Sequence, residues 1–195
     1  MQEVEFEEKS MLSEQSYLNL LNGFKTNESD AVIQHNDYFE TLSFDLKHSR
    51  SALRIRTIGQ AYTLTLKQPH DKGILETHQA ITEKEWSHAT KANIIPFGDV
   101  YRQLQSLCIP IDKLIYLGRL TTKRIELPYK NGTLCLDKSL YFDQIDYEVE
   151  FEGTDEVHAR TTLLTLLTDY NITPKHADNK VKRFFKRKKE LNTDR

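Results

Sequence analysis

Near the start of the chain, Glu3, Glu5 and Glu7 alternate with Val4 and Phe6. Successive side chains of a β-strand point to opposite faces, so the three glutamates share one face and the apolar pair lies on the other. Like charges repeated along one strand face repel one another. Such a strand becomes favourable when cationic groups or metal ions lie against its charged face, and this requirement constrains the rest of the fold.

Period-2 patterns predict several further strands, and the pattern over 31–46 predicts one or two more. The predicted strands are 53–58, 62–67, 114–120, 122–128, 133–140 and 146–152, and 75–80 is compatible with a further short strand. Asn131-Gly132 predicts a hairpin between two of them. Helices are predicted over 14–24, 82–92, 99–107 and 155–170, with a basic helix after Pro174. Because no repeat or long linker interrupts the pattern, we expect a single α+β domain over 1–195. It has a helical insert at about 82–108 and C-terminal helices at about 155–190.

Charge is segregated by strand. Arginine and lysine occupy one face of the central strands, at Arg54, Arg56, Lys67 and Arg124, whereas glutamate repeats on the last strand at 148–152. A solvated sheet face is the simpler interpretation of any one strand. The joint pattern favours another arrangement, because the opposite face of nearly every strand is apolar and helices are available to cover it. We therefore expect an antiparallel β-barrel with a charged interior and helices packed outside.

A lumen of this kind suits an anionic ligand. Arginine and lysine neutralise phosphates, and clustered carboxylates hold hard divalent cations such as Mg²⁺ or Mn²⁺. Without metal or ligand, one or more of the glutamates is expected to have a raised pKa.

The residues in this order resemble the CYTH superfamily, the triphosphate tunnel metalloenzymes. The resemblance begins with the ExExK motif of Glu5, Glu7 and Lys9 and covers nearly the whole chain. Its later parts are Tyr38-Phe39-Glu40-Thr41, Leu53-Arg54-Ile55-Arg56, Leu64-Thr65-Leu66-Lys67, Glu76, Arg124, Asp137 and Glu148-Val149-Glu150. The chain looks most like a branch from Gram-positive bacteria often labelled as adenylate cyclase.

The resemblance implies an eight-stranded antiparallel tunnel that binds a triphosphate. The implied phosphate-binding residues are Arg54, Arg56, Lys67, Arg124, Lys180 and Arg183. The implied ligands of one or two Mg²⁺ or Mn²⁺ ions are Glu5, Glu7, Glu148, Glu150 and Asp137. Lys9 and Glu7 are the implied catalytic residues, with Lys9 contacting phosphate or helping to position the attacking water. The resemblance also implies that Glu5 and Glu7 lie near Glu148 and Glu150.

Some positions depart from the family pattern or stay open. Many members carry a basic residue two positions before Arg124, where this chain has Thr122. Arg119 or Lys123 could replace it only if a bulge shifts the strand face. Glu76 could ligate metal or balance arginine charge. His78 is expected at the surface or the tunnel edge rather than as a catalytic base.

Composition narrows the partners and the location. The net charge of −2 argues against nucleic acid as a partner of the whole chain. Neither a membrane-spanning run nor a signal peptide is predicted, and Cys108 and Cys135 are expected to be reduced and near the core. We therefore expect a cytoplasmic protein, and a homodimer is compatible with the sequence. The basic run over 180–189 is interpreted first as a solvated helix, and second as an arm that attracts an anion.

Three functions compete. The first is metal-dependent hydrolysis of a triphosphate, foremost inorganic tripolyphosphate, with thiamine triphosphate and nucleoside triphosphates as further substrates. The second is an adenylate cyclase that converts ATP to cyclic AMP and pyrophosphate. The third is a polyphosphate- or nucleotide-binding module without catalysis, which would not need four or more clustered carboxylates.

Overall fold

The computed structural model describes residues 1–71 and 73–193. Its strands form a closed barrel with hydrogen-bonded neighbours in the order β1-β5-β4-β3-β2-β6-β7-β8, which confirms the predicted fold class. The strands are β1 (Gln2–Leu12), β2 (Val32–Thr41), β3 (Ala52–Ile58), β4 (Ala61–His70), β5 (Gly73–Ile81), β6 (Leu114–Tyr129), β7 (Gly132–Tyr141) and β8 (Gln144–Gly153).

The predicted helices are present. They are α1 (Glu14–Gly23), α3 (Glu83–Ala92), α4 (Asp99–Ser106), α5 (Glu156–Asp169) and α6 (Lys180–Thr193), and a short α2 (Asp45–His48) follows β2. Thr82 and Glu85 form a capping box at the start of α3, as the sequence indicated. No helix in the described part of the chain combines the length and apolar composition needed to cross a membrane.

The structure corrects three local details of the prediction, although the predicted hairpin between β6 and β7 is present. The segments 114–120 and 122–128 form one continuous strand, β6, and its pairing with β7 begins at Thr121. The hairpin turn lies one residue early, at Lys130 and Asn131, which both have positive φ, and Gly132 already pairs with Tyr129. Cys135 is buried as expected, but Cys108 is exposed.

The described chain divides into two compact units. Unit 1 comprises residues 1–5 and 34–120, and unit 2 comprises residues 6–33 and 121–195, counting only the described residues within these ranges. The boundary falls within β1, so its first residues pair with β5 in unit 1 and its later residues pair with β8 in unit 2.

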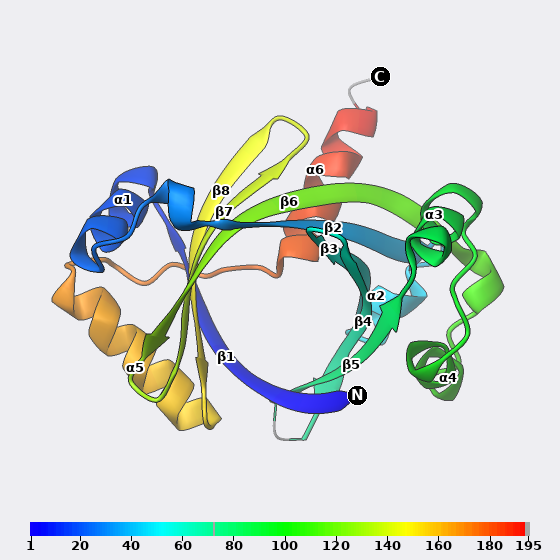
Figure 1. Ribbon diagram of the computed structural model, residues 1–195, viewed down its shortest axis with the longest axis horizontal. Coiled ribbons are helices and arrows are strands. Elements are labelled where there is room, and N and C mark those ends of the chain that lie inside the picture. The colour runs from blue at the N-terminus through cyan, green and yellow to red at the C-terminus, as the bar shows by residue number, and fades with distance from the viewer. Residues whose placement is uncertain (72, 194–195) are drawn as a thin grey trace. The chain divides into compact units, whose positions relative to one another are not determined.

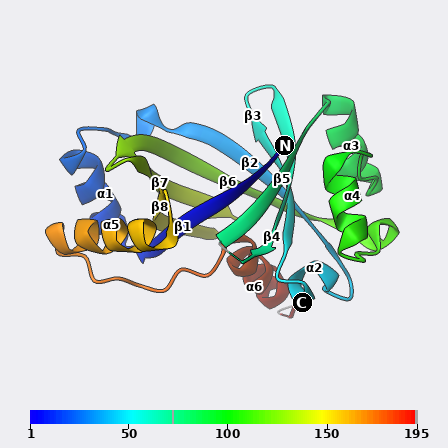
Figure 2. The ribbon, with the colours of Figure 1, turned by 90° about the horizontal axis from the view of Figure 1, so that it is seen from below.

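In unit 1, helices α3 and α4 lie side by side next to β4 and β5 (Figures 1 and 2). The apolar face of the strands packs with these helices. Its fully buried members include Leu53, Ile55, Leu64 and Leu66. Since side chains alternate along a strand, burial of this face fixes the opposite face of β3 and β4 as the one that carries Arg54, Arg56 and Lys67.

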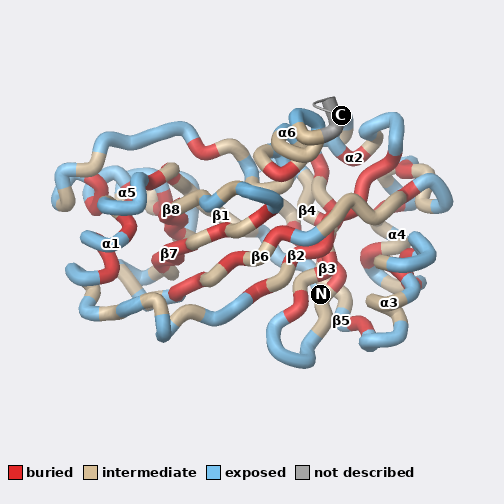
Figure 3. Tube along the Cα trace, turned by 90° about the horizontal axis from the view of Figure 1, so that it is seen from above, coloured by how far each residue is buried: buried red, intermediate tan, exposed pale blue. Residues whose placement is uncertain are grey.

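In unit 2, α1 and α5 cover the apolar face of β7 and β8, and the buried stretches of these strands are visible in Figure 3. Leu134, Leu136, Val149 and Phe151 are fully buried in this core. The same alternation places Asp137 and the glutamates of β8 on the other face. Helix α6 reaches that polar face through its basic side chains.

A buried carboxylate joins three elements of unit 1 on the helix-covered side. Asp37 of β2 is fully buried and accepts hydrogen bonds from Trp86 Nε1 at 2.8 Å and Tyr116 Oη at 2.9 Å. Arg119 donates to it twice, from Nε at 2.9 Å and from Nη2 at 2.8 Å. Four donors compensate the loss of water around this charge, so the network ties α3 and β6 to β2.

Replacing Asp37 with Asn is expected to lower the free energy of unfolding by about 3 kcal/mol, because it leaves donors in a buried site without acceptors. Urea denaturation monitored by circular dichroism measures this. The exposed Asp112→Asn, which makes the same chemical change, serves as the control and should change stability by less than about 0.5 kcal/mol. Equal stability of the two variants would contradict the assigned role of the network.

Candidate functional site

The polar face of β2–β5 in unit 1, called here the arginine face, is the first of two candidate sites. Strand register places its members in adjacent rows, since Asn36 pairs with Arg56, Arg56 with Thr63, Arg54 with Thr65 and Lys67 with Glu76. The members are Gln34, Asn36, Tyr38, Arg54, Arg56, Thr63, Thr65, Lys67, Glu76 and His78.

The two arginines of β3 are held differently from other arginines of the chain. Arg54 Nε is buried and has no hydrogen-bond partner in the described structure. Arg56 Nε donates to the amide oxygen of Asn36 at 3.1 Å. Buried donors are normally satisfied, so the bare Arg54 Nε indicates a place where a ligand or water supplies an acceptor.

At one end of the arginine face, Lys67 forms ion pairs with two glutamates. Its Nζ lies 2.7 Å from Glu5 Oε2 and also forms an ion pair with Glu76. Burial acts to raise the pKa of Glu76, but Lys67, a hydrogen bond with Glu5 and the charge of Arg54 outweigh it and lower the pKa to about 2. Glu76 therefore balances basic charge in this structure, one of the two roles that the sequence left open.

His78 lies at the margin of the same face. Its Nδ1 is 3.0 Å from Thr65 Oγ1, and its Nε2 is 3.0 Å from Glu3 Oε1 and 3.3 Å from Glu76 Oε2. Glu3 is largely exposed, so the ring sits between a buried and a solvated carboxylate. This placement agrees with the edge position expected from the sequence.

Unit 2 holds the second candidate site, the carboxylate cluster, which comprises Asp137 of β7 and Glu148 and Glu150 of β8. All three are buried. Asp137 pairs with Glu148 across the β7–β8 ladder, and Arg124 of β6 pairs with Asp137 across the β6–β7 ladder. Arg124 donates to both oxygens of Asp137, from Nε at 2.8 Å and from Nη2 at 2.7 Å, and also contacts Glu150.

Helix α6 inserts an ammonium group among these carboxylates. Lys180 Nζ lies 2.7 Å from Glu150 Oε1, 2.8 Å from Asp137 Oδ2 and 3.2 Å from Glu148 Oε2. Arg183, one turn later, donates to Glu148 Oε2 at 2.5 Å and to Asp146 Oδ2 at 2.9 Å. Both basic residues thus contact carboxylates here, while their predicted contact with phosphate stays a prediction.

The carboxylate cluster is electrostatically uneven. Burial raises the pKa of Glu148, and the charge of Glu150 adds to this, against the opposing effects of Lys180 and Arg183. For Glu150, the nearby charges of Lys180, Arg124 and Lys9 outweigh burial and lower the pKa well below its usual value. A glutamate with a raised pKa was expected from the sequence, and Glu148 is that residue.

Strand β1 contributes the remaining predicted residues. In unit 2, Lys9 pairs with Glu150 and Glu7 with Glu152 in the β1–β8 ladder, and Lys9 Nζ donates to Glu7 Oε1 at 2.6 Å. Glu5 belongs to unit 1, where it contacts Lys67. The ladder places Glu7 opposite Glu152 and Lys9 opposite Glu150, while the expected proximity of Glu5 and Glu7 to Glu148 and Glu150 stays a prediction.

No basic side chain replaces Thr122 by a shift of the strand face. Thr122 is buried with its hydroxyl 3.2 Å from that of Ser139, and Lys123 pairs with Lys138 in an uninterrupted ladder. Arg119 is held by Asp37 on the helix-covered side of unit 1. The bulge considered from the sequence is therefore absent over the paired residues of β6 and β7.

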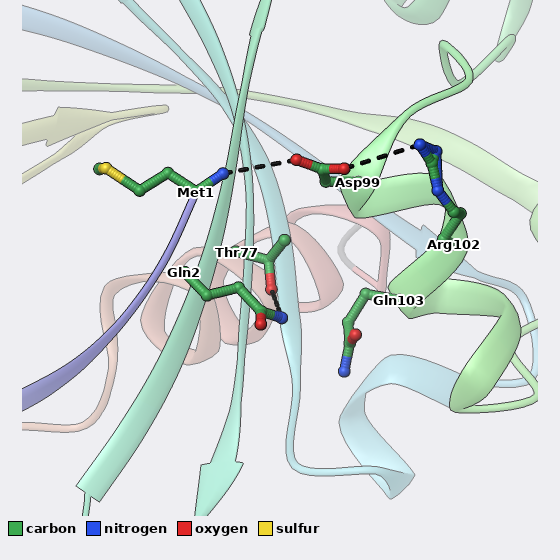
Figure 4. A pocket seen from close by; sticks show the side chains of 6 residues that line it. All are labelled: Met1, Gln2, Thr77, Asp99, Arg102 and Gln103. Carbon is green, nitrogen blue, oxygen red and sulfur yellow. Dashed lines mark hydrogen bonds and ion pairs between the residues drawn. The ribbon is translucent and has the colours of Figure 1, made fainter.

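A cavity of about 390 Å³ lies elsewhere in unit 1, lined by Met1, Gln2, Thr77, Asp99, Arg102 and Gln103 (Figure 4). Its charges pair with one another, since Asp99 lies 3.4 Å from the Met1 amine and 3.7 Å from Arg102 Nη2. Gln2 Nε2 donates to Thr77 Oγ1 at 3.0 Å. This cavity contains none of the predicted site residues.

Sequence reasoning missed Gln34 and Asn36 of β2, which are 3% and 1% exposed on the arginine face. The available signal was their alternation with His35 and Asp37, which places two uncharged amides on the strand next to Arg54 and Arg56. Uncharged side chains do not stand out in a charge pattern.

Comparisons with known proteins agree with this geometry. Residues 1–185 match the model of the CYTH domain. A Bacillus subtilis protein named "Putative triphosphatase YjbK" is 39% identical over 189 residues, covering 97% of this chain and 98% of the relative. The crystal structure of a "putative adenylate cyclase" from Bacillus halodurans superposes with a TM-score of 0.91 and 42% identity, covering 94% of this chain and 98% of that one. A Hippeastrum protein described as a "putative adenylyl cyclase" with "a dominant triphosphatase activity" shares the fold, with a TM-score of 0.73 at 21% identity, over 95% of this chain and 96% of that one.

Glu76 is expected to make stability depend on acid pH. Its pKa in the folded protein, about 2, lies below the ordinary value of 4.5, so its ionised form stabilises the fold above pH 4.5. This contribution is lost as the pH falls from 4.5 toward 2. Glu76→Gln should therefore reduce stability by roughly 2 kcal/mol at pH 7 and flatten the stability loss within that window.

Urea unfolding at a series of pH values between 2 and 7 measures the effect. Glu83→Gln, on the exposed side of α3, is the matched control and should keep the wild-type pH profile. A Glu76→Gln profile that runs parallel to that of the wild type would show that Glu76 does not contribute this pH dependence.

Proposed function

The chain belongs to the CYTH domain family, and we propose that it is a divalent-metal-dependent triphosphatase acting foremost on inorganic tripolyphosphate. The observation that carries the proposal is the arginine face. On it Arg54 has a buried Nε without a hydrogen-bond partner in the described structure, a donor that a ligand oxygen could satisfy. Guanidinium groups match the geometry of phosphate oxygens, and Lys67, paired with Glu5 and Glu76, lies on the same face.

The carboxylate cluster supports the proposed role of Mg²⁺ or Mn²⁺. Glu148 Oε1 is buried without a hydrogen-bond partner, which marks an unsatisfied oxygen donor. Around the cluster, six carboxylates face four basic groups, a formal excess of two negative charges when all are ionised. They are Glu7, Asp137, Asp146, Glu148, Glu150 and Glu152 against Lys9, Arg124, Lys180 and Arg183. Hard oxygen donors and this excess fit one divalent cation.

Lys180 Nζ now sits among these donors. No group of three or more metal-binding side chains in the described residues has the geometry of a ready metal site. The proposal therefore requires the ammonium to leave when a cation binds to Glu148, Glu150 and Asp137. When bound, the cation would supply charge neutralisation and an activated water.

The protein's own residues would do the positioning. Arg54, Arg56 and Lys67 bind the phosphate chain, which aligns the terminal phosphorus and neutralises charge that develops during phosphoryl transfer. Glu7 and Lys9, held together at 2.6 Å, form a carboxylate–ammonium pair that can orient a water and stabilise a phosphate oxygen.

Adenylate cyclase remains the second candidate, because the Bacillus halodurans protein that carries this description is 42% identical. The same phosphate-binding residues would serve it, with the α-phosphorus of ATP as the reacting centre. The described residues that bind phosphate do not distinguish the two reactions, so products must be measured.

We expect wild-type protein to release phosphate from tripolyphosphate with Mg²⁺ or Mn²⁺, and none in EDTA. Glu7→Gln should lower kcat by about 100-fold or more, because it removes a charged group that binds metal or orients water. Glu8→Gln, on the opposite face of the same strand, is the matched control and should retain activity.

The same assay with ATP and thiamine triphosphate separates the candidates. Formation of cyclic AMP and pyrophosphate from ATP would show that the protein is an adenylate cyclase rather than a hydrolase. Tight binding of tripolyphosphate without turnover under any metal condition would instead support a non-catalytic binding module.

The metal part of the proposal has its own test. Lys180→Met removes the ammonium that occupies the carboxylate cluster, so we expect Mn²⁺ to bind about tenfold or more tightly than to wild type. Isothermal titration calorimetry with Mn²⁺ alone measures this. Lys182→Met, which removes an exposed ammonium two residues later, is the control and should bind Mn²⁺ as wild type does. Weaker binding to Lys180→Met would mean that the cation does not take that position.

A further inference from the structure

The arginine face changes character along its strands. Its basic rows run from Lys67 through Arg54 to Arg56. Beyond them, toward the β3–β4 turn, the same face carries small or aliphatic side chains. These are Ile58 of β3, Ala61 of β4 and Ala80 of β5. Ile58 is 38% exposed, so the face ends at solvent on this side.

Gln34 of β2 lies at the same end of the face. In the β2–β3 ladder Tyr38 pairs with Arg54 and Asn36 with Arg56, and Gln34 is the next residue of β2 on this face. Since a strand rises by about 3.3 Å per residue, Gln34 lies about 7 Å beyond the row of Arg56. Its side chain is 3% exposed, and its amide oxygen is buried without a hydrogen-bond partner in the described structure.

Other polar side chains on this face of β2 find their partners within the protein. Glu40, toward the opposite end of the strand, accepts hydrogen bonds from three backbone N–H groups around the start of α2. The amide oxygen of Asn36 accepts from Arg56 Nε at 3.1 Å. A buried acceptor without a donor is unfavourable, so the oxygen of Gln34 indicates a place where a ligand supplies a donor.

We propose that Gln34 is a specificity-determining residue, whose amide oxygen accepts a hydrogen bond from a ribose hydroxyl of a nucleoside triphosphate bound on the arginine face. This inference rests on the proposed function, because it extends the phosphate site to the group attached at one end of the phosphate chain. An ionised phosphate chain carries acceptors and no donors, so tripolyphosphate does not satisfy this oxygen. A ribose does, because it is joined directly to the phosphates and its hydroxyls donate. The aliphatic side chains at this end of the face suit the carbon atoms of the sugar.

The experiment combines a change in the protein with a change in the ligand. Gln34→Met keeps the length of the side chain and removes its amide, while 2′,3′-dideoxy-ATP keeps the base and triphosphate of ATP and lacks both ribose hydroxyls. Isothermal titration calorimetry measures binding of ATP, the dideoxy analogue and tripolyphosphate. Alkaline buffer with EDTA ensures that neither a phosphate proton nor a metal-bound water supplies a donor.

We expect wild-type protein to bind ATP about tenfold more tightly than the dideoxy analogue, the effect of one hydrogen bond to a buried group. Gln34→Met should lower the affinity for ATP by about tenfold, abolish the difference between the two nucleotides and change the affinity for tripolyphosphate by less than about twofold. Gln105→Met, which removes an exposed amide from α4, is the matched control and should bind all three ligands as wild type does. Circular dichroism tests the folding of each variant, and Gln34→Ala replaces Gln34→Met if the latter does not fold.

The outcomes separate the inference from the function on which it rests. Equal losses of affinity for ATP and tripolyphosphate in folded Gln34→Met would overturn the inference, because the amide would then act on the phosphates. It also fails if wild-type protein binds ATP and the dideoxy analogue equally, or binds tripolyphosphate but neither nucleotide. Each of these results leaves the proposed function intact. If wild-type protein does not bind tripolyphosphate in EDTA, nor with Ca²⁺ in place of Mg²⁺ or Mn²⁺, the proposed function and the inference fail together.

Discussion

Compensation of buried charge is the constraint on which the structure depends. Moving an ion from water into a protein interior costs several kcal/mol unless opposite charges and hydrogen bonds replace the lost water. Strand alternation concentrates the problem, because burying one apolar face under helices commits every second side chain to the other face. In unit 2 this brings Asp137, Glu148 and Glu150 together, and the fold meets the cost with Arg124 and an ammonium from α6.

The choice of compensating group separates structural from ligand-binding roles. Where an arginine meets a buried carboxylate, as Arg119 meets Asp37, the pair is closed and ties elements together. Where a buried donor has no acceptor in the described structure, as at Arg54 Nε, a ligand can supply one. Arginine therefore has two roles within one unit, depending on which strand face it occupies and whether a carboxylate accepts its hydrogen bonds there.

Much of the fold and part of the site could be predicted from the sequence. Period-2 patterning placed Arg54 and Arg56 opposite Leu53 and Ile55, because local alternation does not depend on distant contacts. The continuity of β6 was not predicted, since period-2 patterning alone does not show whether two neighbouring strand segments are joined. The position of Lys180 was equally hidden, because a basic helix looks solvated until the chain brings it against buried carboxylates.

The sequence by itself determined which side chains share a strand face, which family the motifs resemble and where helices begin, because these follow from local spacing and capping. Only the tertiary structure decided what each charge meets. It placed Lys180 among three carboxylates, paired Arg119 with Asp37 and placed Asn36 against Arg56. The physical reason is that a charge partner is chosen by proximity in space, with separations of 20 to 82 residues along the chain in these pairs.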